Sequence, residues 1–93
     1  MKHYIIVKFN RKIAEEEFND IKNIFNKTLS IEGVNSIDYF RSCSERENRF
    51  DLMIKMDMTK EGLLLYDVSA PHKEWKEKYK NLIESKAIFD CEE

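Results

Sequence analysis

The residues best suited to chemistry lie close together, in the stretch between Tyr66 and Tyr79. This stretch contains one of the two histidines, His72, and the only proline and tryptophan of the chain, Pro71 and Trp75. Imidazole and phenol groups are side chains that enzymes use to exchange protons near neutral pH. We therefore place the polar end of a candidate site in this stretch.

Pro71 predicts where the helix that carries His72 begins. Proline fixes its own φ and restricts the residue before it, so one helix is predicted to end near Ser69, and the next to begin at Pro71 with Ala70 extended. At about 100° per residue, His72 shares a stripe with Trp75, Tyr79, Leu82 and Ile83. His72 thus faces inward, in a first helical turn whose dipole favours the neutral imidazole, and it could act as a general base.

A structural role for the same residues is the alternative. A histidine on an apolar stripe is commonly a packed residue whose ring nitrogens bond to nearby backbone groups. Trp75 and Tyr79 are expected in the core rather than around a cofactor. The sequence leaves both interpretations of His72 open.

Composition limits the class of protein. The 93 residues predict one domain over residues 1–93, with 37% charged and 42% hydrophobic residues and two glycines. The formal net charge is −2, so no basic footprint favours nucleic acid or an anionic membrane as a partner. Lys8 interrupts the apolar run at the amino end, and no stretch reaches the roughly 18 apolar residues of a membrane span. A cytoplasmic location is expected.

Cysteine and histidine spacing predicts no metal centre and no cofactor. Cys43 and Cys91 stand alone, with no C-x-x-C motif, and are expected to be free thiols. Main-chain oxygens near residues 31–34 could hold a hard cation, but no residue commits the chain to one.

Periodicity predicts the elements that position these residues. Alternating patterns predict strands over residues 3–9, 34–41, 49–57 and 86–91. A first helix is predicted from the inward stripe Ala14, Phe18, Ile21, Phe25 and Leu29, and a short second helix from the N-cap Thr59. The order is that of a ferredoxin-like α+β fold, a four-stranded antiparallel sheet with helices on one face.

Both faces of the first strand carry large apolar residues, whereas the helices can cover only one. His3, Ile5, Val7 and Phe9 alternate with Tyr4, Ile6 and Lys8. A second copy of the sheet is the simplest cover for the other face, and two-fold homodimers are the commonest oligomers. The sequence therefore predicts a homodimer joined through the sheet faces as a barrel.

The chain resembles the stress-responsive A/B barrel domain (Dabb) family over nearly its whole length. The resemblance is carried by the order and spacing of His3-Tyr-Ile-Ile-Val-Lys8, Ile31-Glu-Gly-Val34, Phe50-Asp51, Tyr66 to His72 and Ile88-Phe-Asp90. It implies a dimeric α/β barrel with a pocket in each subunit between the sheet and its helices. Some plant members of this family are cofactor-independent polyketide cyclases.

The resemblance also implies roles for particular residues. Tyr66 and His72 match the tyrosine and the histidine six residues later that those cyclases use, so His72 would remove a proton from carbon and Tyr66 would hydrogen-bond the carbonyl. His3 would be a second polar contact. The pocket lining would come from Ile5, Val7, Ile21, Phe25, Trp75, Ile83 and Ile88. Family members commonly have His-Pro-x-His where this chain has Ser69-Ala-Pro-His72, and a glycine where bulky Phe40 and Arg41 lie nearby.

Three functions fit these residues. The first is a small dimeric barrel that binds a small hydrophobic ligand or has a structural, stress-related role. The second is an enzyme of cyclase or proton-transfer type that works through Tyr66 and His72. The third is a cofactor-free monooxygenase that acts on an electron-rich substrate. Fold alone does not fix function, so the pocket must decide between them. An open pocket lined by Tyr66 and His72 would favour the second function over the first.

Overall fold

Four strands form one antiparallel sheet in the order β2-β3-β1-β4 in the computed structural model, which describes residues 1–93. The strands are β1 (Lys2–Phe9), β2 (Val34–Arg41), β3 (Leu52–Met58) and β4 (Ile83–Cys91). The helices are α1 (Glu15–Asn26), a 3-10 turn η1 (Lys27–Ser30), α2 (Lys60–Asp67) and α3 (Ala70–Tyr79). This is the predicted ferredoxin-like arrangement.

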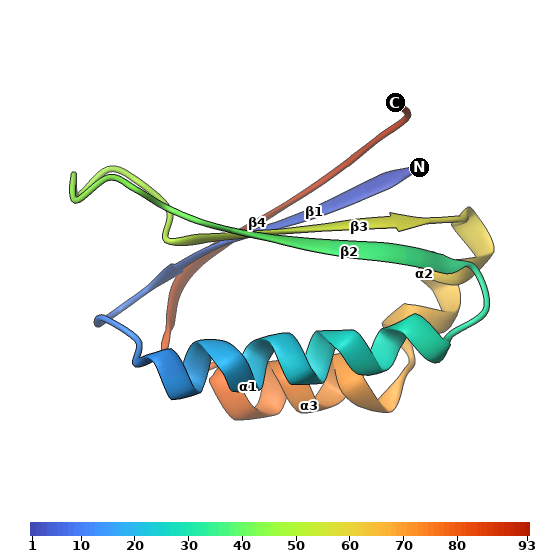
Figure 1. The fold of residues 1–93 in the computed structure, drawn as a ribbon, viewed down its shortest axis with the longest axis horizontal. Helices are drawn as coiled ribbons and strands as arrows, with labels where there is room; N and C mark the ends of the chain where they lie inside the picture. Colours follow the sequence, from blue (N-terminus) through green and yellow to red (C-terminus); the bar gives the residue numbers. More distant parts are fainter.

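Two layers make up the molecule. Figure 1 shows α1 and α3 side by side beneath the sheet, with α2 at one end, while the opposite face of the sheet carries no helix. Both chain ends lie at the same end of the sheet, and the β2–β3 connection projects from the other. The prediction that helices cover one face only is confirmed.

Strand β1 lies at the centre of the sheet and shows the predicted difference between its faces. His3, Ile5, Val7 and Phe9 are buried against the helices, whereas the residues between them are only half-buried. Since successive side chains of a strand point to opposite faces, this alternation builds the core on one side of the sheet. The core has 15 buried apolar residues, which come from β1, α1, β2, β3, α2 and α3.

Several predicted boundaries differ from the structure. Ala70 is not extended but is the first residue of α3, because Ser69 takes the extended N-cap position (φ −77°, ψ 155°). Strand β3 begins at Leu52 rather than Arg49, and β4 begins three residues before Lys86. Leu29 was predicted to face inward but is 46% exposed, since α1 ends at Asn26 and the tighter turn of η1 buries Thr28 instead.

The two glycines of the chain touch each other where β2 meets α2. Gly33 has φ +92°, a conformation that side chains other than that of glycine rarely allow. A Cβ atom at Gly62 would lie 2.6 Å from the Gly33 carbonyl oxygen, and one at Gly33 would lie 2.4 Å from Oγ1 of Thr59. The absence of side chains therefore lets the start of α2 pack directly on the turn before β2.

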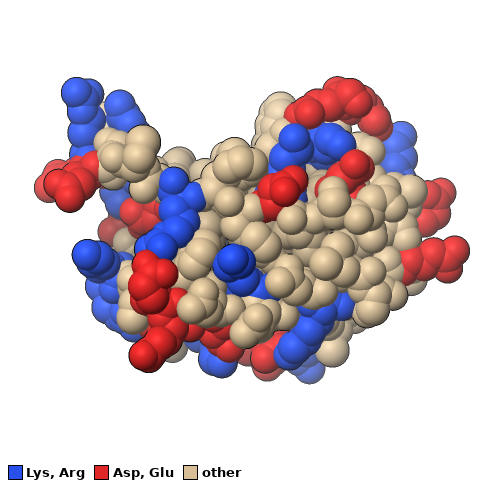
Figure 2. Space-filling model, in the orientation of Figure 1, with Lys and Arg blue, Asp and Glu red and all other residues tan.

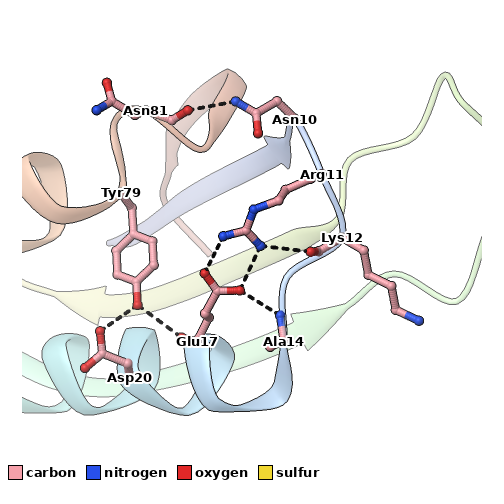
Figure 3. Close-up of polar contacts among 8 residues, drawn as sticks. All are labelled: Asn10, Arg11, Lys12, Ala14, Glu17, Asp20, Tyr79 and Asn81. Carbon is pink, nitrogen blue, oxygen red and sulfur yellow. Dashed lines mark hydrogen bonds and ion pairs between the residues drawn. The ribbon is translucent and has the colours of Figure 1, made fainter.

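Glu17 holds the chain that leads into α1. Arg11 binds both of its carboxylate oxygens, at 2.9 and 2.8 Å, and the backbone N–H of Ala14 donates to Oε1 at 2.8 Å (Figure 3). Close by, the Tyr79 hydroxyl donates to Asp20 at 2.5 Å and thereby connects the end of α3 to α1. These contacts fix the two helices that lie beneath the sheet.

Ionised Glu17 is expected to stabilise the fold above about pH 4.5. The Arg11 guanidinium, helped by the Ala14 amide, lowers the pKa of Glu17 from 4.5 to about 2. Because the folded pKa is the lower one, this stabilisation is lost as pH falls from 4.5 towards 2. Urea midpoints at pH 7, 4.5 and 2.5 should therefore fall more steeply for the wild type than for Glu17→Gln.

A neighbouring carboxylate provides the control for this prediction. Glu16 lies in the same helical turn and makes no ion pair or hydrogen bond through its side chain, so Glu16→Gln should retain the steep acid dependence of the wild type. Equal pH slopes for the wild type and Glu17→Gln would show that Glu17 adds nothing to stability.

Candidate functional site

A pocket opens between the sheet and the α2–α3 corner, with a volume of about 250 Å³. Strands β1 and β4 supply one wall, and α2 and the start of α3 supply the other. The ten lining residues are His3, Ile5, Leu63, Tyr66, Asp67, His72, Trp75, Lys86, Ile88 and Asp90. The residues of the Tyr66–His72 stretch thus meet the buried face of β1.

Tyr66 lies between the two histidines of the chain. Its ring centroid is 5.8 Å from that of His3, in an edge-on arrangement, and 4.6 Å from that of His72. Tyr66 is only 1% exposed, and its hydroxyl makes no hydrogen bond to the protein. No side-chain nitrogen or oxygen is fully buried without a partner, so the small exposed part of Tyr66 includes its hydroxyl oxygen at the pocket.

Ser69 sets the spacing between Tyr66 and His72. Its hydroxyl donates to the Tyr66 carbonyl at 2.7 Å and accepts from the His72 backbone N–H at 3.3 Å. Serine is a favoured N-cap because its side-chain oxygen satisfies a free N–H of the first helical turn. One side chain therefore ends α2, begins α3 and fixes the two candidate catalytic residues relative to each other.

The hydrogen bond of His72 determines which ring nitrogen carries the lone pair. Nδ1 lies 2.9 Å from the backbone carbonyl oxygen of Asp67, which can only accept a hydrogen bond. Nδ1 is thus the donor, and in the neutral ring Nε2 is left as the base. The same contact is the backbone bond expected of a packed histidine, so His72 combines both predicted features: a structural bond on one nitrogen and a ring that lines the pocket.

His3 has an equivalent arrangement with a stronger partner. Its Nδ1 is hydrogen-bonded to the carboxylate of Asp90 on the neighbouring strand β4, and His3 is 5% exposed. The pair follows from the antiparallel register, which places His3 directly opposite Asp90. A carboxylate partner fixes the tautomer and the orientation of an imidazole.

Burial keeps the Tyr66 hydroxyl protonated. Removal from water raises the pKa of Tyr66 well above its usual value of 10.0, and the charge of Asp67 raises it further. A phenol in this state donates a hydrogen bond. Tyr66 is therefore suited to bind the oxygen of a carbonyl group, and its donor strength matters most when that oxygen gains negative charge.

The structure brings together six of the ten residues predicted for the site. These six are His3, Ile5, Tyr66, His72, Trp75 and Ile88. Val7, Ile21 and Phe25 lie instead in the closed core, where each is at most 1% exposed. Ile83 lines a separate groove on the other side of Trp75.

Four lining residues were not among those predicted: Leu63, Asp67, Lys86 and Asp90. Two of them could have been found from the alternation of β4, since residues 86, 88 and 90 share a face with Ile88. Leu63 precedes Tyr66 by three residues and so lies on the same side of α2. Asp67 has no comparable signal in the sequence. It lies at the pocket because its backbone carbonyl contacts His72 in the folded chain.

Bulky residues near the end of β2 do not fill the pocket. Phe40 projects from the opposite face of the sheet, where it pairs with Met53 and is 47% exposed. Arg41 reaches α1, where it binds Glu15 at 2.6 Å. Neither side chain lines the pocket, so the absence of a glycine at this position does not close the pocket.

Possible metal ligands do not cluster in the structure. No group of three or more His, Cys, Asp or Glu side chains is placed to hold a metal ion. At residues 31–34, the carbonyl oxygens of Ile31 and Gly33 accept hydrogen bonds from Val34 and Thr59. Cys43 and Cys91 are free thiols. None of the helices has the length and hydrophobicity needed to span a bilayer.

Solved structures share this fold at low sequence identity. A Dabb family protein with a ferredoxin-like fold from Mesorhizobium loti is 15% identical, with a TM-score of 0.74 over 99% of this chain and 94% of that one. A dimeric ferredoxin-like protein of unknown function from Thermobifida fusca is 10% identical, with a TM-score of 0.77 over 95% and 85%. Two further matching proteins are also described as dimeric.

An enzyme is among the proteins with this fold. Hydroxynitrile lyase from Passiflora edulis is 11% identical, with a TM-score of 0.75 over 95% of this chain and 87% of that one. No family model matches the sequence, and a search of curated proteins finds no match. At these identities the structural similarities establish the fold: this chain has the ferredoxin-like α+β fold that a Dabb family protein and several dimeric proteins also have.

Proposed function

We propose that the protein is a homodimeric barrel that binds a small, mostly apolar carbonyl compound in the Tyr66–His72 pocket and moves a proton on it. The observation that carries this proposal is the open cavity beside an unpartnered Tyr66 hydroxyl, flanked by two imidazoles. Ligand pockets usually have volumes of about 300–1,000 Å³. A cavity of about 250 Å³ therefore favours a small molecule over a long ligand that folds back on itself.

The polar groups have complementary roles in this proposal. Nε2 of His72 accepts a proton from the carbon next to the carbonyl, and that C–H electron pair moves to form an enolate. The Tyr66 hydroxyl donates a hydrogen bond to the enolate oxygen. His3, held by Asp90, is a further polar contact. The enolate carbon either regains a proton from His72 or adds to a second carbonyl of the same molecule, whose oxygen then takes the proton from His72; the addition is the cyclase outcome.

Two observations support an acid–base role over a purely structural one. The pocket is open rather than filled, and His72 and His3 both keep Nε2 free of protein hydrogen bonds. The hydroxynitrile lyase with this fold adds weak support, since it shows that an enzyme can be built on it. Binding without turnover is the alternative, favoured by the backbone bond that packs His72 against Asp67.

The uncovered face of the sheet supports the dimer. Strand pairing places Phe40, Met53, Ile6 and Ala87 in one apolar row across all four strands. On the same face, the ion pairs Lys55–Glu93 (3.7 Å) and Lys2–Asp57 (2.8 Å) lie two and four positions along β3 from this row. Figure 2 shows that the upper outline, above the sheet, is hollowed between two charged projections and is mostly uncharged at its floor. An apolar centre with a charged rim is typical of a protein interface.

Deuterium exchange tests the proposed chemistry without knowledge of the natural substrate. The wild type should accelerate loss of the α-hydrogen signals of 2-heptanone or 4-phenylbutan-2-one in D₂O, followed by NMR. His72→Gln should slow the catalysed exchange by roughly 10²–10⁴-fold and Tyr66→Phe by roughly 10²–10³-fold, because they remove the base and the oxyanion donor.

Tyr39→Phe is the matched control. The Tyr39 hydroxyl donates a hydrogen bond to Oδ1 of Asn26 on α1 at 2.8 Å and lies outside the pocket, so this variant should exchange at the wild-type rate. Undiminished exchange in His72→Gln would contradict the assigned base. If the ketones shift the His72 ring signals but exchange no faster than in buffer, the pocket binds ligands without catalysis.

A further inference from the structure

A second groove runs between α3 and the free edge of β4. Its floor is formed by Trp75 and Ile83, its volume is about 300 Å³, and its remaining lining residues are Lys76, Glu77, Lys80 and Lys86. Trp75 is 1% exposed, so the floor is firmly packed. The groove is thus apolar at its base and charged at its rim.

The rim carries an excess of unpaired positive charge. The side chains of Lys76, Lys80 and Lys86 make no ion pair or hydrogen bond, whereas Lys2, Lys27 and Lys78 of the same chain each bind a carboxylate at 2.8–2.9 Å. Three lysines against the single carboxylate of Glu77 give this groove a formal charge of 3 − 1 = +2, in a chain whose net charge is −2.

Helix electrostatics accounts for only part of this cluster. Lys76 and Lys80 lie at the carboxyl end of α3, where cations interact favourably with the helix dipole. Lys86 belongs to β4 and gains nothing from that dipole. A lysine on an edge strand can discourage strand pairing, but this does not require it to share a groove with the other two.

The groove adjoins the Tyr66–His72 pocket. Trp75 and Lys86 line both. Along β4, residues 86, 88 and 90 face the same side, so Lys86, Ile88 and Asp90 follow one another from the cationic groove to the His3 end of the pocket. At about 3.3 Å per residue, Lys86 and Asp90 lie roughly 13 Å apart along the strand.

We propose that Lys76, Lys80 and Lys86 bind a carboxylate at one end of the ligand whose carbonyl group lies at Tyr66 and His72. This inference rests on the proposed function and assigns the ligand class. The ligands are keto acids whose two polar ends are separated by an apolar segment that packs on Ile88 and Trp75. The ligand carboxylate then lies beside the three lysines, at the water-exposed end of the groove. There each ammonium group keeps most of its hydration.

A matched pair of compounds tests the assignment. 7-Oxooctanoate and its neutral analogue 7-oxooctanamide have the same ketone and the same chain, so their dissociation constants, measured by NMR titration, isolate the carboxylate. Partly exposed ion pairs each strengthen binding only modestly, because water screens them. We expect the acid to bind about 5- to 10-fold more tightly than the amide at low salt, with the advantage shrinking as ionic strength rises.

Two variants separate the groove from general surface charge. The triple variant K76Q/K80Q/K86Q should bind the acid and the amide equally. K73Q removes an unpaired lysine of α3 that lies outside the groove and should keep the wild-type preference. An acid preference that survives in the triple variant, or is lost in K73Q, would overturn the assignment.

The ring signals of His72 distinguish this inference from the proposed function. If both compounds shift His72 with equal affinity, the pocket binds carbonyl compounds and the lysine groove assignment is wrong. If the acid shifts the Lys86 and Trp75 signals but leaves His72 unchanged, the groove binds anions and the proposed pocket function is wrong. If neither compound binds at millimolar concentration, both proposals are contradicted for this ligand class.

Discussion

Trp75→Ala is expected to lower the free energy of unfolding by about 3–5 kcal/mol, the usual loss when a buried tryptophan is truncated. Trp75 is 1% exposed and contacts the Phe25 ring edge-on at 5.1 Å and the Tyr79 ring at 5.5 Å. Its removal would join the pocket to the neighbouring groove and leave both aromatic partners without packing. Since small domains have about 5–15 kcal/mol of stability in total, this is a large fraction.

Urea unfolding followed by far-UV circular dichroism measures this loss, because Trp75 is the only tryptophan and its fluorescence disappears with it. Protein concentration must be held constant, since a dimer is stabilised by mass action. Leu64→Ala is the control: Leu64 is 68% exposed on α2, and its truncation should change stability by less than about 0.5 kcal/mol. If Trp75→Ala unfolds before measurement, Trp75→Phe should fold with a smaller loss. A wild-type midpoint for either Trp75 variant would contradict the packing described.

Met53→Glu is expected to convert the proposed homodimer into a monomer at micromolar concentration. Met53 lies between Phe40 and Ile6 in the apolar row of the uncovered sheet face. A dimer closed over this row would bury the new carboxylate without a partner, which costs several kcal/mol. At 1.4 kcal/mol per tenfold change, the dissociation constant should rise roughly 100-fold or more.

Sedimentation velocity over a concentration series tests this prediction. Leu64→Glu adds the same charge to an apolar side chain exposed on α2, away from the sheet face, and should leave the dimer intact. Met53 is half-buried in the isolated chain, so the Met53→Glu monomer should keep its circular dichroism spectrum. A monomeric wild type would contradict the dimer, and dissociation caused by Leu64→Glu alone would place the interface on the helical layer.

The proposed dimer interface and the pocket lie on opposite faces of the same strands. On β1, His3 and Ile5 line the pocket while Ile6 belongs to the apolar row, and on β4 Ile88 lines the pocket while Ala87 belongs to the row. Because side chains alternate along a strand, a change in the register of either strand would disturb both features at once. The proposed assembly therefore holds in place the strands that form the pocket wall.

Local patterns in the sequence were enough to predict most of the fold. The alternation in residues 3–9 and 34–41 and the Ser69-Ala-Pro motif each reflect interactions within a few residues, and these elements are present at or near the predicted positions. The inward face of β1 was also predicted correctly. Errors fell at element ends, such as Leu29 and Ala70, where a cap or a tighter turn outweighs periodicity.

The site itself depended on contacts between distant parts of the chain. Periodicity assigned Ile5 and Val7 to the same inward face, but only the packing of α2 and α3 decided that Ile5 borders a cavity while Val7 is closed in the core. Asp90 reaches His3 across 87 positions because strand register, which no local pattern encodes, sets them opposite each other. The sequence by itself determined which residues share a face, and the tertiary structure decided which of them meet empty space, because a cavity is what remains after every element has packed.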